Sequence, residues 1–542
     1  MLPKLALWLA ALGGAALGPV ADAARVPVTG VRTNPGSPVP LRLNINDMQA
    51  RGGPVWDLFL LSLKEMHEMS PTDQLSFFQI AGIHGKPYVQ WNDAGGRRSD
   101  GWGGYCPHGE KNFLPWHRPY LALYEQEVVK HARRIASTYP QRYRAQYQRA
   151  ADQLRVPFWD WASDQSVPQA TVPGRVRVNT PSGQALRSTE IENPLATYRF
   201  PRNVLNGQFG EWDSQRRPQI YHCVAPYSYP TSANSNLRSR PYKQWTYDAL
   251  TRSGSFDEFA SPEGGGVGIE QIHNAVHWDG SCGGQFLALD FTAFDPLFMM
   301  HHCNADRLWA YYSAMNPRSS AIFSSSYTGG ARFATPSGTR ITPDSPLEPF
   351  YQTNGQFHTS RTVSSIRNFG YSYEGLEYWS KSEGQMRADA VRLVNRLYSP
   401  GGFSAAGMLS VKKPQTRYFV QLELDMAQVP RPCQVQVLVS EKFAGSMVVM
   451  QQPGHGIMQG GFPIDNAVKE AGLNKLGKEE AVAKIKEVLK VKIIKGDGET
   501  VAVESVSSFK WELEAITYTP AAGEEGLPKF TNPQKHALKV SG

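Results

Sequence analysis

Histidines among bulky apolar residues constrain this chain most, because a buried imidazole needs a partner for its ring nitrogens. Apolar residues recur at helical spacing over residues 54–69, and three further helices are predicted over 114–136, 269–278 and 295–313. The last three contain His117, His273 with His277, and His302. The pattern predicts a mainly α fold, in which a four-helix bundle surrounds a shared histidine site.

Each histidine segment by itself has a less specific interpretation. His273 and His277 are four residues apart and share one helix face, but an isolated pair of this kind is more often a surface or core accident. His117 lies in the run Phe-Leu-Pro-Trp-His-Arg over 113–118, where a satisfied core histidine is the alternative. Coordination by imidazole alone suits copper or zinc and also allows nickel or iron. Two clusters of three histidines would favour a binuclear centre.

The last of these segments also carries a carboxylate. His301 and His302 follow Asp295-Pro296-Leu297-Phe298, and Asp306 lies one turn further on. Asp295 is the expected N-cap of this helix. An Asp placed like Asp306 can orient a ligand histidine, directly or through a neighbouring Arg. Composition cannot separate His301 from His302.

Two long motifs with fixed spacing resemble the copper signatures of tyrosinases and haemocyanins. The first joins His108 to the segment 113–118 and Glu125, and the second joins residues 295–298 to His302 and Asp306. The resemblance extends over residues 26–400 and implies a four-helix bundle that holds two copper ions. The implied ligands are His84, His108 and His117 for one ion, and His273, His277 and His302 for the other. His84 is assigned by its position before the signature, whereas the second signature selects His302 over His301.

The resemblance assigns roles to three further residues. In fungal tyrosinases a cysteine two residues before the ligand histidine forms a thioether with it, which implies a Cys106–His108 cross-link; a small buried thiol is the alternative. That bond leaves four cysteines, of which Cys223 and Cys282 are one disulfide candidate. Glu270 and Asn274 match residues that hold a water for deprotonating a monophenol, although an exposed helix glutamate is the plain alternative.

The chain divides into four parts. Residues 1–23 have the charged start, apolar stretch and small residues of a secretory signal peptide, and no segment is long enough to span a bilayer. We expect a catalytic domain over 24–398, a proteolytically processed linker over 399–414 and a β-rich, sandwich-like shielding domain over 415–542. The net charge of +8 is spread along the chain, so no nucleic-acid partner is expected.

The C-terminal part resembles the shielding domain of fungal tyrosinases, which implies a latent proenzyme and a processing protease. Phe443 and Phe462 are candidates for the side chain that covers the site. Cys433 stands alone, so the Cys-x-x-Cys copper-loading motif of some relatives is absent. Tyr371 and Tyr373 match a Tyr-x-Tyr element that pairs with an N-terminal arginine, here Arg42.

The sequence therefore predicts a secreted phenol oxidase that uses two copper ions and O2. Its expected reactions are ortho-hydroxylation of monophenols such as tyrosine and oxidation of o-diphenols to o-quinones, which is melanin-type chemistry. Trp278, directly after His277, is expected either at the substrate entrance or in the core. The alternatives are a catechol oxidase that acts on diphenols alone, a haemocyanin-like oxygen carrier and a structural zinc protein.

Overall fold

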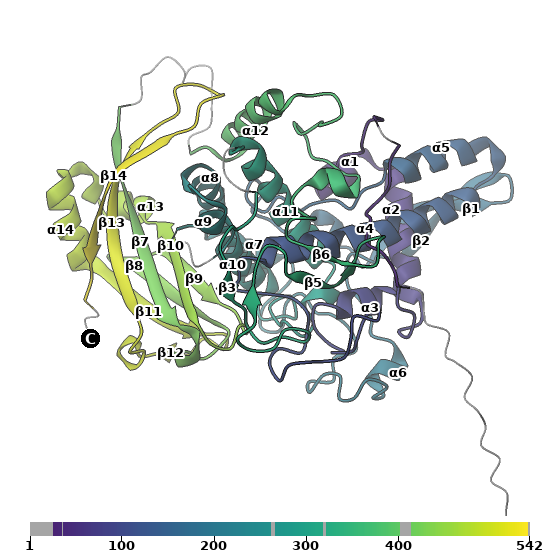
Figure 1. Cartoon of the computed structure of the whole chain (residues 1–542), viewed down its shortest axis with the longest axis horizontal. Helices are drawn as coiled ribbons and strands as arrows, with labels where there is room; N and C mark the ends of the chain where they lie inside the picture. The colour runs from purple at the N-terminus through teal and green to yellow at the C-terminus, as the bar shows by residue number, and fades with distance from the viewer. Residues whose placement is uncertain (1–24, 35, 262–265, 318–320, 401–412, 540–542) are drawn as a thin grey trace, which may run out of the picture.

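The computed structural model describes residues 25–34, 36–261, 266–317, 321–400 and 413–539. A helical body is followed by a smaller strand-rich domain, which lies against one side of it (Figure 1). The expected signal peptide and most of the expected linker lie outside the described residues. Within the described ranges, none of the helices is both long and apolar enough to cross a bilayer.

The four predicted helices are present, and their ends lie within three residues of the predicted ones. They are α2 (Gly53–Glu68), α4 (Phe113–Ser137), α10 (Ile269–Ser281) and α11 (Leu297–Met315). Around them lie α1 (Ile45–Arg51), α3 (Phe77–Gly82), α5 (Gln141–Gln153), α6 (Arg202–Leu205), α7 (Thr231–Arg238), α8 (Tyr242–Arg252), α9 (Phe256–Ala260) and α12 (Glu383–Tyr398). Three hairpins complete the body: β1 (Arg175–Ser182) with β2 (Ala185–Glu192), β3 (Tyr327–Thr328) with β4 (Arg340–Ile341), and β5 (Pro346–Tyr351) with β6 (Phe357–Thr359).

Asp295 caps α11, but it lies one residue before the N-cap position and not at the N-cap as predicted. Pro296 occupies the N-cap position, and the Asp295 carboxylate accepts a hydrogen bond from the Leu297 N–H at 2.9 Å. The other carboxylate oxygen lies 2.8 Å from Nδ1 of His222. Since proline has no N–H, the first donor that the carboxylate can serve is that of Leu297.

A buried ionic cluster joins α4, α11 and the N-terminal segment. Arg42 donates to Glu125 at 2.9 Å, to Asp306 at 3.2 Å and to the Tyr373 hydroxyl at 3.1 Å. Its guanidinium also lies 3.5 Å from the centre of the Tyr371 ring. The predicted pairing of Arg42 with the Tyr-x-Tyr element is confirmed.

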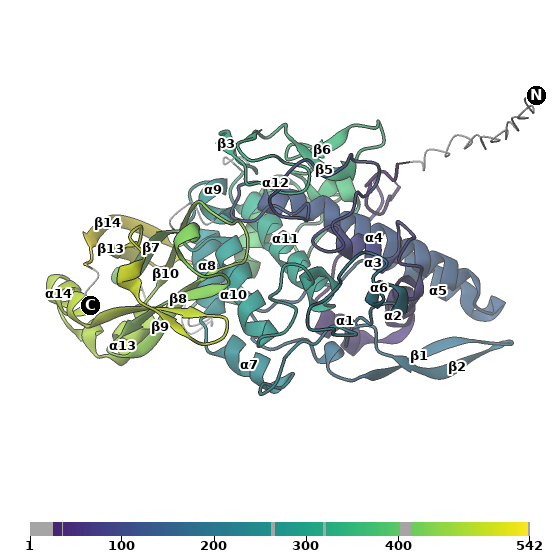
Figure 2. The ribbon, with the colours of Figure 1, turned by 90° about the horizontal axis from the view of Figure 1, so that it is seen from below.

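The C-terminal domain is a sandwich of two four-stranded antiparallel sheets (Figure 2). One sheet has the order β10 (Ile457–Pro463), β7 (Gln415–Asp425), β13 (Lys510–Thr519), β14 (Lys529–Ala537). The other has the order β12 (Thr500–Val501), β11 (Leu489–Lys495), β8 (Cys433–Val439), β9 (Lys442–Val449). Helices α13 (Asp465–Glu470) and α14 (Lys478–Val488) pack on the sandwich. The predicted β-rich domain is confirmed.

Strand β10 was not predicted, because its two glycines disfavour a strand. Tertiary contact explains them. A Cβ on Gly460 would lie 2.7 Å from Oε1 of Gln271 on α10, and one on Gly461 would lie 2.1 Å from Oε1 of Gln421. The Gln271 amide also donates to the Gly461 carbonyl and accepts from its N–H, at 3.2 and 3.1 Å. The missing side chain of Gly460 lets this strand approach the histidine helix α10, and that of Gly461 leaves room for Gln421 on the paired strand β7.

Buried ion pairs hold the two domains together. Arg417 on β7 donates to both carboxylate oxygens of Asp248 on α8, at 2.6 and 2.8 Å. Arg252 on α8 donates to Glu514 on β13 at 2.6 Å. Burial of these charges makes the interface depend on complete pairing, because an unpaired buried charge is strongly destabilising.

Replacing Arg42 with Met should destabilise the protein by about 3–5 kcal/mol, because Glu125 and Asp306 lose a buried counter-charge. Urea unfolding followed by circular dichroism measures this loss. Arg361→Met is the matched control, since Arg361 pairs with Asp344 on the surface and should cost less than about 1 kcal/mol. Equal losses for the two variants would contradict the importance of the Arg42 cluster.

Candidate metal centre

Six histidines from different parts of the chain meet at the centre of the helical body. His117 lies on α4, His273 and His277 lie on α10, and His302 lies on α11. His84 lies just beyond Ile83, the C-cap of α3, and His108 lies in the loop before α4. All six are buried, with at most 5% of any of them exposed. The structure therefore brings together every histidine that the sequence singled out as a ligand.

Three of these rings converge on one point. The Nε2 atom of His273 lies 3.0 Å from Nε2 of His277 and 3.1 Å from Nε2 of His302. Ligand nitrogens about 2.0–2.1 Å from one metal ion lie about 3.3 Å apart. The three nitrogens are therefore spaced as ligands of a single ion.

The other three rings form a second group beside the first. The ring centres of His84, His108 and His117 lie 5.2–5.8 Å from one another. The His117 ring stacks on that of His302 with 4.2 Å between centres, so the two groups adjoin. Among the described residues, both ring nitrogens of His84, Nδ1 of His108 and Nε2 of His117 are buried without a hydrogen-bond partner. Such buried nitrogens are what a second metal ion requires.

Hydrogen bonds determine which nitrogen of each ring is available. Nδ1 of His117 lies 2.8 Å from the Phe113 carbonyl, and Nδ1 of His277 lies 2.7 Å from the Phe286 carbonyl. Nδ1 of His273 lies 2.9 Å from the side-chain oxygen of Asn274. In each ring Nδ1 donates its proton to an oxygen, so Nε2 remains as the metal ligand.

Burial keeps all six rings neutral, because it lowers their pKa values. The pKa values of His117 and His277 fall to about 3. Those of His84, His108, His273 and His302 also lie well below the usual value, through burial first and then through repulsion among the rings. Neutral imidazole is the form that binds metals. The donor set, which is all imidazole in two groups of three, fits a pair of copper ions.

His301 lies beside the group formed by His273, His277 and His302, but its ring is oriented differently from that of His302. Its ring stacks on that of His273 at 4.7 Å and lies about 6 Å from the rings of Trp159 and Trp161. Its ligand atoms lie within 4.8 Å of those of His273, His277 and His302. The close Nε2 contact with His273 belongs to His302, in agreement with the choice made from the signature.

Asp306 supports the histidine site through the helices that carry the rings. It accepts hydrogen bonds from Arg118, Arg42, Tyr371 and Tyr373. These contacts join α11, which carries His302, to α4, which carries His117. The carboxylate therefore positions the two ligand helices.

Cys106 lies beside the loop histidines. Its thiol donates to the His84 carbonyl at 3.2 Å and accepts from the Trp102 indole at 3.3 Å. Burial raises the pKa of this thiol far above its usual value. Gly104 makes the arrangement possible, because a Cβ there would lie 1.9 Å from the His84 carbonyl oxygen.

The predicted Cys223–Cys282 disulfide is present, while Cys303 and Cys433 are buried thiols within the described chain.

Glu270 and Asn274 lie one turn apart on α10, on the side that faces the C-terminal domain. Glu270 accepts a hydrogen bond from the Gly109 N–H at 2.5 Å, next to His108. Both residues line a cavity of only about 10 Å³, whose other walls are Met426, Met450, Gln452, Pro453, Ile457 and Met458 of the C-terminal domain. A space of this size holds about one water molecule, so a phenol does not fit beside Glu270 while the domain is in place.

Neither aromatic residue that we considered as a cover lies at this cavity. Phe462 is fully buried, packs 5.8 Å from the ring of Trp245 and faces Gly445. Phe443 is 37% exposed and lies over Arg240. Methionine and proline side chains close the cavity instead. Sequence reasoning missed them because nothing in their spacing distinguishes them from core residues. Trp278 is half-buried and does not line this cavity either.

Comparisons with known proteins agree with the geometry. The model of the common central domain of tyrosinase matches residues 74–315. A tyrosinase of Podospora anserina is 31% identical over 423 residues, which cover 72% of each chain. A tyrosinase of Neurospora crassa is also 31% identical, over 72% of this chain and 61% of its own length. Polyphenol oxidase 3 of Agaricus bisporus is 30% identical over 62% of this chain and 61% of its own length.

Solved structures share the fold over nearly the whole chain. Recombinant mushroom tyrosinase superimposes with a TM-score of 0.78 and 20% identity, over 95% of this chain and 100% of its own. A variant of Aspergillus oryzae pro-tyrosinase gives a TM-score of 0.73 and 21% identity, over 96% and 99% of the two chains. Both domains therefore have counterparts in known structures.

Exchanging His302 for Gln should reduce bound copper from two ions to about one per chain, because one group loses a ligand. His301→Gln is the matched control and should retain both ions. Metal analysis by mass spectrometry after dialysis measures the difference. Loss of copper from the His301 variant alone would show that the neighbouring ring is the ligand.

Proposed function

Since the chain belongs to the tyrosinase family, we propose that it is a secreted, latent phenol oxidase that hydroxylates monophenols and oxidises o-diphenols to o-quinones. One ion would be held by His84, His108 and His117, and the other by His273, His277 and His302. When bound, the two copper ions supply the redox chemistry with O2. The remaining parts of the reaction fall to side chains of this chain.

The placement of Glu270 and Asn274 carries the proposal for monophenols. Asn274 orients the His273 ring through Nδ1, and the carboxylate of Glu270 lies one turn away on the same face. A carboxylate there holds a water that takes the phenol proton, which leaves a phenolate to react. Hydroxylation of a monophenol needs this proton transfer, whereas a catechol oxidase lacks the hydroxylation step.

Latency is supported by the closed cavity over Glu270. The C-terminal domain closes it with Met450, Pro453 and Met458, and buried ion pairs hold the domain on the helical body. Solved structures with this fold include latent mushroom tyrosinase and Aspergillus oryzae pro-tyrosinase. Cleavage within residues 399–414 by a processing protease would separate the domains and open the site.

A thioether between Cys106 and His108 belongs to the same proposal. The Cys106 sulfur and the His84 and His108 nitrogens lie within 4.8 Å of one another. The bond replaces one S–H and one ring C–H, so O2 at the copper site is the required two-electron oxidant. It would restrain the His108 ring in its loop.

Limited proteolysis tests latency and reaction class together. The intact chain should oxidise L-tyrosine and L-dopa at most slowly, and cleavage within residues 399–414 should raise both rates by about tenfold or more, because substrate gains access. Quinone formation is followed by absorbance. Turnover of dopa alone after cleavage would assign a catechol oxidase instead, and O2 binding without either turnover would assign an oxygen carrier.

Exchanging Glu270 for Gln should separate the two activities of the cleaved protein. The amide keeps the side-chain shape and an acceptor for Gly109 but cannot take a proton. We expect kcat/KM for L-tyrosine to fall by about 10²-fold, and that for L-dopa by less than about tenfold. The matched control is Glu68→Gln on the surface of α2. Equal losses for both substrates would remove the proposed role of Glu270.

A further inference from the structure

The segment over residues 221–224, which we call the strap, is attached to the end of α10. Cys223 forms the disulfide with Cys282, the C-cap residue of that helix. The Gln285 N–H donates to the Tyr221 carbonyl at 3.2 Å, and the Tyr221 N–H donates to the side-chain oxygen of Gln285 at 2.8 Å. Gln285 is fully buried, so the strap and the turn that follows α10 form one packed unit.

This turn leads directly into the backbone group that orients His277. Gly284 lies so close to the strap that a Cβ there would be 2.2 Å from the carbonyl oxygens of both Tyr221 and His222. Two residues later, the Phe286 carbonyl lies 2.7 Å from Nδ1 of His277 and accepts its proton. The position of this carbonyl therefore depends on the strap, because the chain just before it is fixed against the strap.

The strap also reaches the start of α11, through His222. Nδ1 of His222 lies 2.8 Å from one carboxylate oxygen of Asp295, and the other oxygen accepts from the Leu297 N–H. Both residues are buried, and the His222 ring stacks on that of Tyr229 with 4.2 Å between centres. A carboxylate can only accept, so Nδ1 is the donor. His222 therefore holds the residue that caps the helix of His302.

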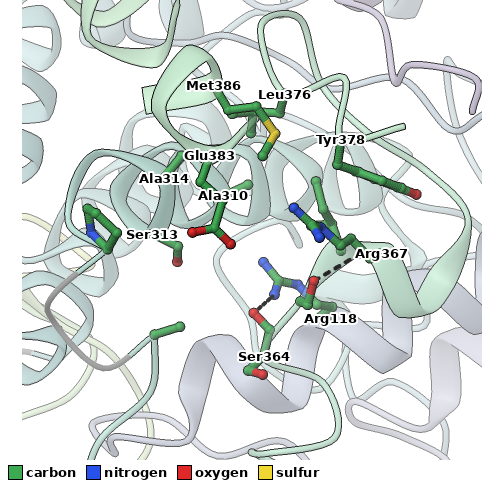
Figure 3. Close-up of a pocket in the computed structure, with 14 residues that line it drawn as sticks. Arg118, Ala310, Ser313, Ala314, Ser364, Arg367, Leu376, Tyr378, Glu383 and Met386 are labelled. Atoms are coloured by element: carbon green, nitrogen blue, oxygen red, sulfur yellow. Dashed lines mark hydrogen bonds between the residues drawn. The ribbon is translucent and has the colours of Figure 1, made fainter. Parts of the chain in front are cut away.

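The support of α11 by Asp306 lies on the other side of His302 along the helix. Asp306 follows His302 by one turn and accepts from Arg118. Arg118 also donates to the Ser364 carbonyl, at the wall of a cavity beside α11 and α12 (Figure 3). Asp295 lies at the opposite, N-terminal end of α11, and there the strap supplies the support.

We propose that His222 is a positioning residue for the metal ion that His273, His277 and His302 hold. Its hydrogen bond to Asp295 fixes the start of α11, and its place in the strap fixes α11 relative to α10. The ligand nitrogens from the two helices then keep the spacing that one ion requires. The inference rests on the proposed ligand set, and it gives His222 no role toward the other ion.

Two substitutions in the full-length chain separate the hydrogen bond of His222 from its ring. His222→Phe keeps a ring on Tyr229 but removes the donor to Asp295, whereas His222→Asn removes the ring and retains an amide donor. Copper retained after dialysis against increasing concentrations of a Cu(I) chelator is measured by mass spectrometry. The Phe variant should bind one of its two ions about tenfold more weakly, and the Asn variant should retain both ions like the parent chain.

Tyr147→Phe is the matched control, because it removes a hydroxyl that donates to the buried carboxylate of Asp57 at 2.8 Å, away from the strap. It should leave both ions unchanged. Unchanged copper retention in His222→Phe, or equal losses in His222→Phe and His222→Asn, would overturn the proposal. His222→Leu also lacks the donor and allows the same comparison if the Phe variant does not fold.

Ligand variants identify which ion is affected. Added to His117→Gln, His222→Phe should weaken the remaining ion about tenfold, whereas added to His302→Gln it should leave the remaining ion unchanged. Equal losses in both backgrounds would show a general loss of stability and overturn the proposal. Retention of both ions by His302→Gln alone would overturn the ligand set, and the inference with it. Loss of one ion there, together with unchanged retention in His222→Phe, would overturn the inference alone.

Discussion

Burial of uncharged imidazoles is the constraint on which the rest of this structure depends. Six rings lie in the centre of a helical body, where burial lowers their pKa values and, among the residues that the structure describes, leaves several ring nitrogens without hydrogen-bond partners. Such a cluster is unfavourable by itself. The bundle compensates through backbone carbonyls that hold Nδ1 of His117 and His277, and metal ions would satisfy the nitrogens that remain.

The ionic cluster around Asp306 holds the helices that carry these rings. Arg42 and Arg118 both donate to its carboxylate, and Tyr371 and Tyr373 complete its shell. Opposite charges lower the pKa of Asp306, although burial alone would raise it.

The C-terminal domain packs closely on α10. Gly460 lets strand β10 approach Gln271, and methionine and proline side chains of the domain line the small space beside Glu270. A sandwich domain with buried ion pairs to the body can therefore cover a site without an aromatic plug. Methionine suits this task, since its flexible side chain fills irregular gaps.

The sequence by itself predicted the four helices and the strand-rich C-terminal part, because helical and strand periodicity are local properties of a chain, and its two motifs implied the set of ligand histidines through resemblance. It also indicated Arg42 through resemblance, Asp306 through its position one turn after His302, and Cys223 with Cys282 as one candidate pair among the cysteines that remained. Only the tertiary structure decided which residues close the cavity and why β10 contains glycines, since both depend on contacts between distant segments.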